Sequence, residues 1–200
     1  MNKFNLFIIL GAILFISCKK EKDMNVLEDN NNNGVIVSKS IATEEIIQEI
    51  DSFFNEVKQV DVYAYFNRTL WEEEDRKDYR HFTNFENNDV LIKEKYLKNK
   101  ISLSKDQINK LRENFKDCYD GITEACYDPR HLFVFYNSKN QIIGHIEICF
   151  ECSNIDCSDN LVKFASCALY SKHLLQEFGI TYFEDTEKDI EDYHKRIENE

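Results

Sequence analysis

The fold is decided between His131 and Cys149, where the sequence reads HLFVFYNSKNQIIGHIEIC. Residues 132–136 and 142–149 are rich in β-branched and aromatic side chains, which favour strands. The polar run over 137–140 is typical of a turn. Two such runs around a short polar turn predict an antiparallel hairpin. We therefore expect this hairpin to form part of a sheet.

The segments around the hairpin show helical and strand patterns. Apolar side chains recur at helical spacing after Thr43 and after Ser104, and both residues are good N-caps. We expect Gly179 to end a third helix. The predicted elements are helices over 43–57, 104–117 and 161–177, a strand over 60–66, and irregular or partly helical chain over 67–100. Together they predict an α+β fold, in which helices pack on a small antiparallel sheet in a single domain.

Composition limits the class of protein. A chain of 200 residues that is 42% hydrophobic can bury one core. The 37 acidic side chains outnumber the 25 basic ones and give a net charge of −12. This charge repels phosphate, so we expect no nucleic-acid partner. The sequence has no glycine-rich phosphate loop and no nucleophile elbow, which disfavours enzymes that act on nucleotides.

The first residues have the pattern of an export signal. Lys3 supplies a positive charge, and the run from Phe4 to Ile16 is apolar except for one asparagine. Its length of about 13 residues is shorter than the roughly 20 that span a bilayer. The sequence Ser17-Cys18 after this run resembles the lipobox of bacterial lipoproteins, in which a diacylglycerol is attached to the cysteine before cleavage. We therefore expect residues 1–17 to be a lipoprotein signal peptide and Cys18 to carry the lipid.

These patterns divide the rest of the chain into three parts. Residues 18–40 begin with the lipidated cysteine and are polar and asparagine-rich, which is typical of a flexible tether. Residues 41–183 are expected to form the α+β globular domain. Residues 184–200 are an acidic tail, predicted to be a solvated helix or a frayed end. We expect the lipid on Cys18 to be the membrane contact, which places the protein in a bacterial cell envelope, with the outer membrane as the expected site.

The hairpin gathers four candidate site residues. If Tyr136 pairs with Gln141, His131 faces Ile146, and a turn centred one residue later moves every partner by two positions. Either register brings the same side chains to one open end of the hairpin. These side chains are Cys126, His131, Cys149 and Cys152.

Three kinds of chemistry fit this cluster. The first is disulfide bonding, because six cysteines follow Cys18 in an exported chain, and we expect Cys126 to bond with Cys149 or Cys152. The second is a zinc site of the Cys₃His type, and zinc is the one cofactor that the pattern suggests. The third is a thiol-disulfide oxidoreductase that uses Cys149 and Cys152, but this pair ends a strand instead of opening a helix. Structural disulfides, with no catalytic residue and no cofactor, are the preferred interpretation.

Three motifs lie between residues 104 and 182. They are C-x-x-P-R-H at 126–131, E-I-C-F-E-C at 147–152 and Phe-Gly-Ile at 178–180. This set resembles a group of uncharacterised lipoproteins from Bacteroidota-type bacteria. The resemblance implies a lipoprotein and implies no activity, so no catalytic residue follows from it.

Two features have both a structural and a functional interpretation. Glu147 lies on a strand that we expect to be buried, where a salt bridge to His131 or Arg130 is the structural interpretation. Four neighbouring aromatic side chains predict either core packing or an exposed face for a partner. They are Tyr63, Tyr65, Phe66 and Trp71. The sequence therefore predicts a lipid-anchored envelope lipoprotein whose domain has a structural role or binds an unknown protein or glycan partner.

Overall fold

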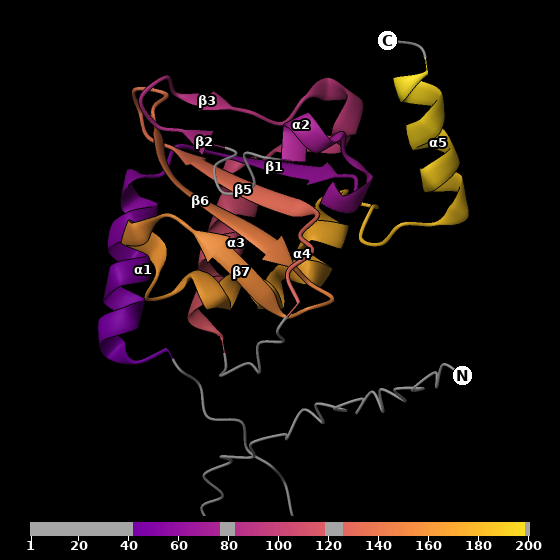
Figure 1. Ribbon diagram of the computed structural model, residues 1–200. Coiled ribbons are helices and arrows are strands. Elements are labelled where there is room, and N and C mark those ends of the chain that lie inside the picture. Colours follow the sequence, from indigo (N-terminus) through magenta and orange to yellow (C-terminus); the bar gives the residue numbers. More distant parts are fainter. Residues whose placement is uncertain (1–41, 77–82, 119–125, 199–200) are drawn as a thin grey trace, which may run out of the picture. The chain divides into compact units, whose positions relative to one another are not determined.

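A five-stranded antiparallel sheet lies at the centre of the folded domain (Figure 1). The computed structural model describes residues 42–76, 83–118 and 126–198. The strands follow the order β4-β1-β5-β6-β7, and all neighbours are antiparallel. Their bounds are β1 Gln59–Tyr65, β4 Leu97–Ser102, β5 His131–Tyr136, β6 Ile142–Cys149 and β7 Asn154–Cys157. The prediction of an α+β fold with an antiparallel sheet is confirmed.

Strands β5 and β6 form the predicted hairpin. His131 pairs with Ile148, which is the second of the two expected registers. The register that pairs Tyr136 with Gln141 is wrong, because Gln141 belongs to the turn. Its backbone N–H donates to the side-chain oxygen of Asn137 over 3.0 Å, and its carbonyl accepts from the backbone N–H of Asn137 over 3.0 Å.

Helices α1 (Glu44–Glu56) and α3 (Lys105–Lys116) confirm two of the three predicted helices. The side chain of Thr43 accepts a backbone N–H in the first turn of α1, as expected of an N-cap. At the start of α3, Ser104 and Gln107 form a capping box, in which each side chain accepts the backbone N–H of the other residue. Local sequence is therefore sufficient to place the beginnings of both helices.

The two faces of the sheet differ in chemistry. On the face that we call the helix face, the ring of Phe54 from α1 lies 5.5 Å from Phe115 of α3 and 6.0 Å from Phe135 of β5. The opposite face, which we call the polar face, carries buried tyrosines and charged groups, since side chains alternate along each strand. Its members include Asp61, Tyr63, Tyr65, Tyr136, His145 and Glu147. Charged side chains are seldom buried in a folded domain, so the polar face is the unusual part of this one. The candidate site lies on this face.

The third predicted helix is wrong over most of its length. Only its last part is α-helical, and the chain before it forms 3₁₀ turns. Cys167 in this stretch is fully buried and bonded to Cys118 at the end of α3, so tertiary packing overrides the helical pattern. Gly179 ends the helix as predicted, with φ at 104°. The three short helices of this stretch are η3 (Asp159–Leu161), η4 (Ala165–Ser171) and α4 (Lys172–Glu177).

The region 67–100, predicted to be irregular or partly helical, also contains most of an edge strand, β4. Its sequence LKNKIS carries two lysines, which suit an edge that faces solvent and hide the strand pattern. The other elements of this region are short. They are η1 (Arg68–Leu70), α2 (Glu73–Arg76), β2 (Thr83–Asn84), β3 (Asp89–Val90) and η2 (Glu94–Tyr96).

The C-terminal segment is a helix, α5 (Glu187–Ile197), which is the first of the two predicted alternatives, but it packs on the domain through one face. Tyr193 is buried, and its ring lies 5.3 Å from the ring of Phe66. The ammonium of Lys98 on β4 lies 2.8 Å from the carboxylate of Asp189. The apolar side chains of Tyr193 and Ile197 and the neighbouring ion pairs thus attach this helix to the domain.

Two predictions lie outside the described residues. They are the signal peptide over 1–17 and the tether over 18–40 that begins with Cys18. All the described elements belong to one compact unit. Within those elements, no helix combines the length and the apolar character that a membrane crossing requires.

Candidate functional site

Four side chains meet at one end of the polar face. We call them the Glu147 cluster, and its members are Tyr65, Arg68, Tyr127 and Glu147. The hydroxyl of Tyr65 and Nη2 of Arg68 both donate to Oε1 of Glu147. The hydroxyl of Tyr127 donates to Oε2 over 2.7 Å. Both carboxylate oxygens of Glu147 therefore have a donor from the cluster itself.

The Glu147 cluster is a buried ion pair with two protonated phenols. Arg68 and Glu147 are each 2% exposed. Burial raises the pKa of the Glu147 carboxyl, while the guanidinium of Arg68 and the two hydroxyls act against that rise. Burial and the neighbouring carboxylate raise the pKa of Tyr65 and Tyr127, so both remain hydrogen-bond donors. The arrangement ties together the end of β1, η1 and the chain before β5.

The expected salt bridge from Glu147 to His131 or Arg130 is wrong. Glu147 pairs with Leu132 across the hairpin, so its side chain lies on the polar face, whereas the adjacent His131 lies on the helix face. The guanidinium of Arg130 binds Asp185 instead, with Nη2 and Oδ2 2.8 Å apart. The true partner, Arg68, is far from Glu147 in sequence.

His131 is enclosed on the helix face. Its Nε2 donates to the carbonyl oxygen of Tyr182 over 2.8 Å, and its ring lies 5.0 Å from Phe150 and 4.7 Å from Phe183. Burial lowers the pKa of the imidazole from 6.5 to about 4. The histidine is thus neutral in the folded domain at neutral pH, with one ring nitrogen donating to the backbone.

This burial predicts that the domain loses stability in mild acid. Between pH 6.5 and about 4 the unfolded chain binds a proton at His131 that the folded domain does not, so stability falls as pH falls through this window. Urea unfolding followed by circular dichroism should show a loss of about 2 kcal/mol at this site between pH 7 and pH 5. His131→Gln should remove this part of the pH dependence. His173→Gln, at an exposed histidine of α4, should retain it, and an equal effect of both variants would contradict the assignment.

The cysteines pair differently from the expectation. Cys149 bonds to Cys152, and Cys118 bonds to Cys167. The expected bridge from Cys126 to Cys149 or Cys152 is therefore not the one that forms. The reason is local, because residues 149–152 lead from β6 into a tight turn and bring the Cα atoms of Cys149 and Cys152 to 5.3 Å.

The four residues predicted to converge do lie at the same end of the hairpin, but not as a set of metal ligands. The carbonyl of Cys126 accepts from Nδ2 of Asn154, the partner of Cys149 across β6 and β7. The sulfur atoms of Cys149 and Cys152 are bonded to each other, and His131 directs Nε2 to a carbonyl. In the described parts of the chain, no three His, Cys, Asp or Glu side chains are arranged to hold a metal ion.

The four neighbouring aromatic side chains are core residues. Tyr63, Tyr65, Phe66 and Trp71 are all buried. The ring of Trp71 stacks on Tyr96 with a centroid distance of 4.3 Å, and its Nε1 donates to the carbonyl of Phe66 over 2.8 Å. The alternative of an exposed aromatic face for a partner is therefore wrong for these residues.

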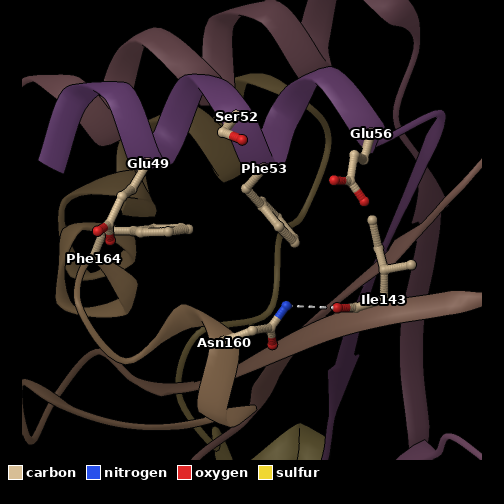
Figure 2. A pocket seen from close by; sticks show the side chains of 7 residues that line it. All are labelled: Glu49, Ser52, Phe53, Glu56, Ile143, Asn160 and Phe164. Atoms are coloured by element: carbon tan, nitrogen blue, oxygen red, sulfur yellow. Dashed lines mark hydrogen bonds between the residues drawn. The ribbon is translucent and has the colours of Figure 1, made fainter. Parts of the chain in front are cut away.

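A depression of about 270 Å³ lies between α1 and the start of β6 (Figure 2). Figure 2 shows the amide of Asn160 turned toward Ile143, whose carbonyl accepts from Nδ2 over 2.9 Å. The carboxylate of Glu49, labelled in the same view, is paired with Lys163. The other residues that line the depression are Ser52, Phe53 and Glu56. The depression is smaller than typical small-molecule sites. None of the candidate site residues predicted from the sequence lines it.

Sequence reasoning missed two members of the Glu147 cluster. Arg68 follows a strand in a polar stretch, and no local pattern marks it as buried. Tyr127 lies inside the C-x-x-P-R-H motif, so the motif could have drawn attention to it. Comparisons of the chain with family models, curated proteins and solved structures found no match.

Proposed function

We propose that this chain is a lipid-anchored lipoprotein of a bacterial cell envelope. The observation that carries the proposal is the apolar run from Phe4 to Ile16 followed by Ser17-Cys18. The motif resemblance to Bacteroidota-type lipoproteins supports it, as do the two disulfides of the domain, which are typical of exported proteins. Acyl chains on Cys18 would supply the membrane contact, with the outer membrane as the proposed site.

We further propose that the domain is a binding or structural module with a protein or glycan partner. Its most unusual side chains support this role, because the carboxylate of Glu147 and the guanidinium of Arg130 bind groups of the domain itself. Buried polar networks of this kind define one rigid arrangement of the chain. A rigid domain on the tether predicted for residues 18–40 would be suited to present a surface at a distance from the membrane.

The lipid anchor is tested by Cys18→Ser in a Gram-negative host. The unchanged protein should incorporate labelled palmitate, and intact mass should show acylation on a chain that begins at Cys18. Cys18→Ser should abolish the label, whereas Cys126→Ser should retain it. Separation of inner and outer membranes by density gradient then locates the protein. Continued acylation of the Cys18→Ser protein would overturn the proposal.

A second candidate function is thiol–disulfide exchange at Cys149 and Cys152. The observation that favours it is the bond between these two cysteines, which are separated by only two residues, as in dithiol oxidoreductases. Incubation with reduced glutathione followed by alkylation tests it. Reversible opening of this disulfide, while Cys118 and Cys167 remain bonded, is the expected result.

A further inference from the structure

The Cys149–Cys152 disulfide is enclosed, but a cysteine beside it is exposed. Cys149 is 1% exposed and Cys152 is 3% exposed, so an external thiol has little direct access to either sulfur. Cys126 belongs to neither disulfide, and its residue is exposed. The exposed thiol and the enclosed disulfide therefore belong to different cysteines.

Two contacts hold the chain around Cys126 along the end of β6. Asn154 is the β7 partner of Cys149, and its Nδ2 donates to the carbonyl oxygen of Cys126 over 3.2 Å. Four residues later, the backbone N–H of Arg130 donates to the carbonyl of Ile148 over 3.3 Å. Asn154 thus contacts both cysteines, since its backbone pairs with Cys149 and its side chain bonds to the carbonyl of Cys126.

The hydrogen bonding of the disulfide distinguishes its two sulfur atoms. The backbone N–H of Cys152 donates to Sγ of Cys149 over 3.2 Å. A hydrogen bond to sulfur stabilises the thiolate. The sulfur with the more stable thiolate is the better leaving group in exchange. Attack on Cys152 with release of Cys149 is therefore the favoured direction.

We propose that Cys126 and the Cys149–Cys152 disulfide form an intramolecular thiol–disulfide exchange site. The proposal rests on the second candidate function and names the residue through which it operates. The Cys126 thiolate forms a bond to Sγ of Cys152 as the Cys149–Cys152 bond breaks. The bonding electron pair goes to Cys149, which takes up the proton that Cys126 lost to solvent. One thiol and one disulfide are present before and after, so this step needs no external oxidant or reductant.

Cys157 provides a matched control in the same part of the domain. It ends β7 and is partly buried. Burial, together with the carboxylates of Asp156 and Asp159, raises the pKa of its thiol to about 11. Cys157 therefore stays protonated at neutral pH and should not compete with Cys126 for the disulfide.

The Cys149→Ser variant tests the geometry, because it removes the leaving group and keeps Cys152. A Cys126–Cys152 disulfide is the expected product in oxidised monomer, with the Cys118–Cys167 disulfide retained. Digestion after Asp and Glu separates the relevant cysteines, since Glu124, Glu151 and Asp156 lie between them. Cys152 found as an alkylated thiol, or bonded to Cys157, would overturn the proposal.

Exchange kinetics in the unchanged protein supply a test that does not depend on the folding of that variant. Cys126→Ser should slow opening of the Cys149–Cys152 disulfide by reduced glutathione roughly tenfold, because it removes the exposed nucleophile. Cys157→Ser should leave the rate unchanged. Equal rates in Cys126→Ser and unchanged protein would overturn the role of Cys126 while the second candidate function stands. A disulfide that stays closed in all three proteins would remove that function as well.

Discussion

Replacing Glu147 by alanine is expected to lower the free energy of unfolding by about 3–5 kcal/mol. The substitution removes the carboxylate that balances the guanidinium of Arg68, which is 2% exposed. It also removes the acceptor for the hydroxyls of Tyr65 and Tyr127. Loss of a hydrogen-bond partner costs about 1–3 kcal/mol for a buried group such as Tyr65, and less for Tyr127, which is 36% exposed. Urea unfolding monitored by circular dichroism measures the change.

Two controls separate this effect from a general sensitivity to charge removal. The double variant Arg68→Met and Glu147→Gln removes both charges but keeps an acceptor for the tyrosines. It should therefore be more stable than Glu147→Ala. Glu177→Ala breaks the ion pair between Glu177 and Lys110, whose two side chains are 54% and 55% exposed, respectively. This variant should lose less than about 1 kcal/mol of the free energy of unfolding. Equal losses in Glu147→Ala and Glu177→Ala would show that burial does not set the effect.

Removing the Cys118–Cys167 disulfide is expected to cost roughly 4 kcal/mol, because the two cysteines are separated by 49 positions. A cross-link of this span restricts the unfolded chain strongly. The separation of Cys149 and Cys152 is only 3, for which the same argument gives roughly 2 kcal/mol. The variants Cys118→Ala/Cys167→Ala and Cys149→Ala/Cys152→Ala provide the comparison, with urea midpoints as the measurement.

Reduction supplies the control for this comparison. Dithiothreitol should destabilise the unchanged protein more than it destabilises the Cys118→Ala/Cys167→Ala variant, which has already lost its long-range cross-link. A larger loss from the Cys149→Ala/Cys152→Ala pair than from the other pair would contradict the loop-length argument. It would indicate that the tight turn after β6 contributes more through native packing than through the unfolded chain.

Local signals account for the parts of the fold that the sequence predicts correctly. The caps at Thr43 and Ser104 and the strand pattern around the hairpin turn act within a few residues, so they can be recognised without the tertiary structure. Strand β4 and the 3₁₀ turns around Cys167 depend on distant partners. The polar residues of β4 hide its pairing with β1, and the bond to Cys118 is not encoded in any periodicity.

The candidate site divides in the same way. Hairpin pairing alone places Cys126, His131, Cys149 and Cys152 at one end of the sheet. It does not determine which sulfur atoms bond, because the choice depends on the turn between β6 and β7. The Arg68–Glu147 pair joins residues 79 positions apart, and only the packed domain brings them together.

The two edges of the sheet have a consequence for aggregation. An exposed strand edge is a template for pairing with another chain. Strand β7 has only four residues, and β4 carries Lys98 and Lys100, while Arg196 of α5 donates to the carbonyl of Leu97 over 2.7 Å. Both edges are thus poor templates for a second copy. On a membrane where the proposed anchor would crowd many copies together, these features favour a domain that remains monomeric.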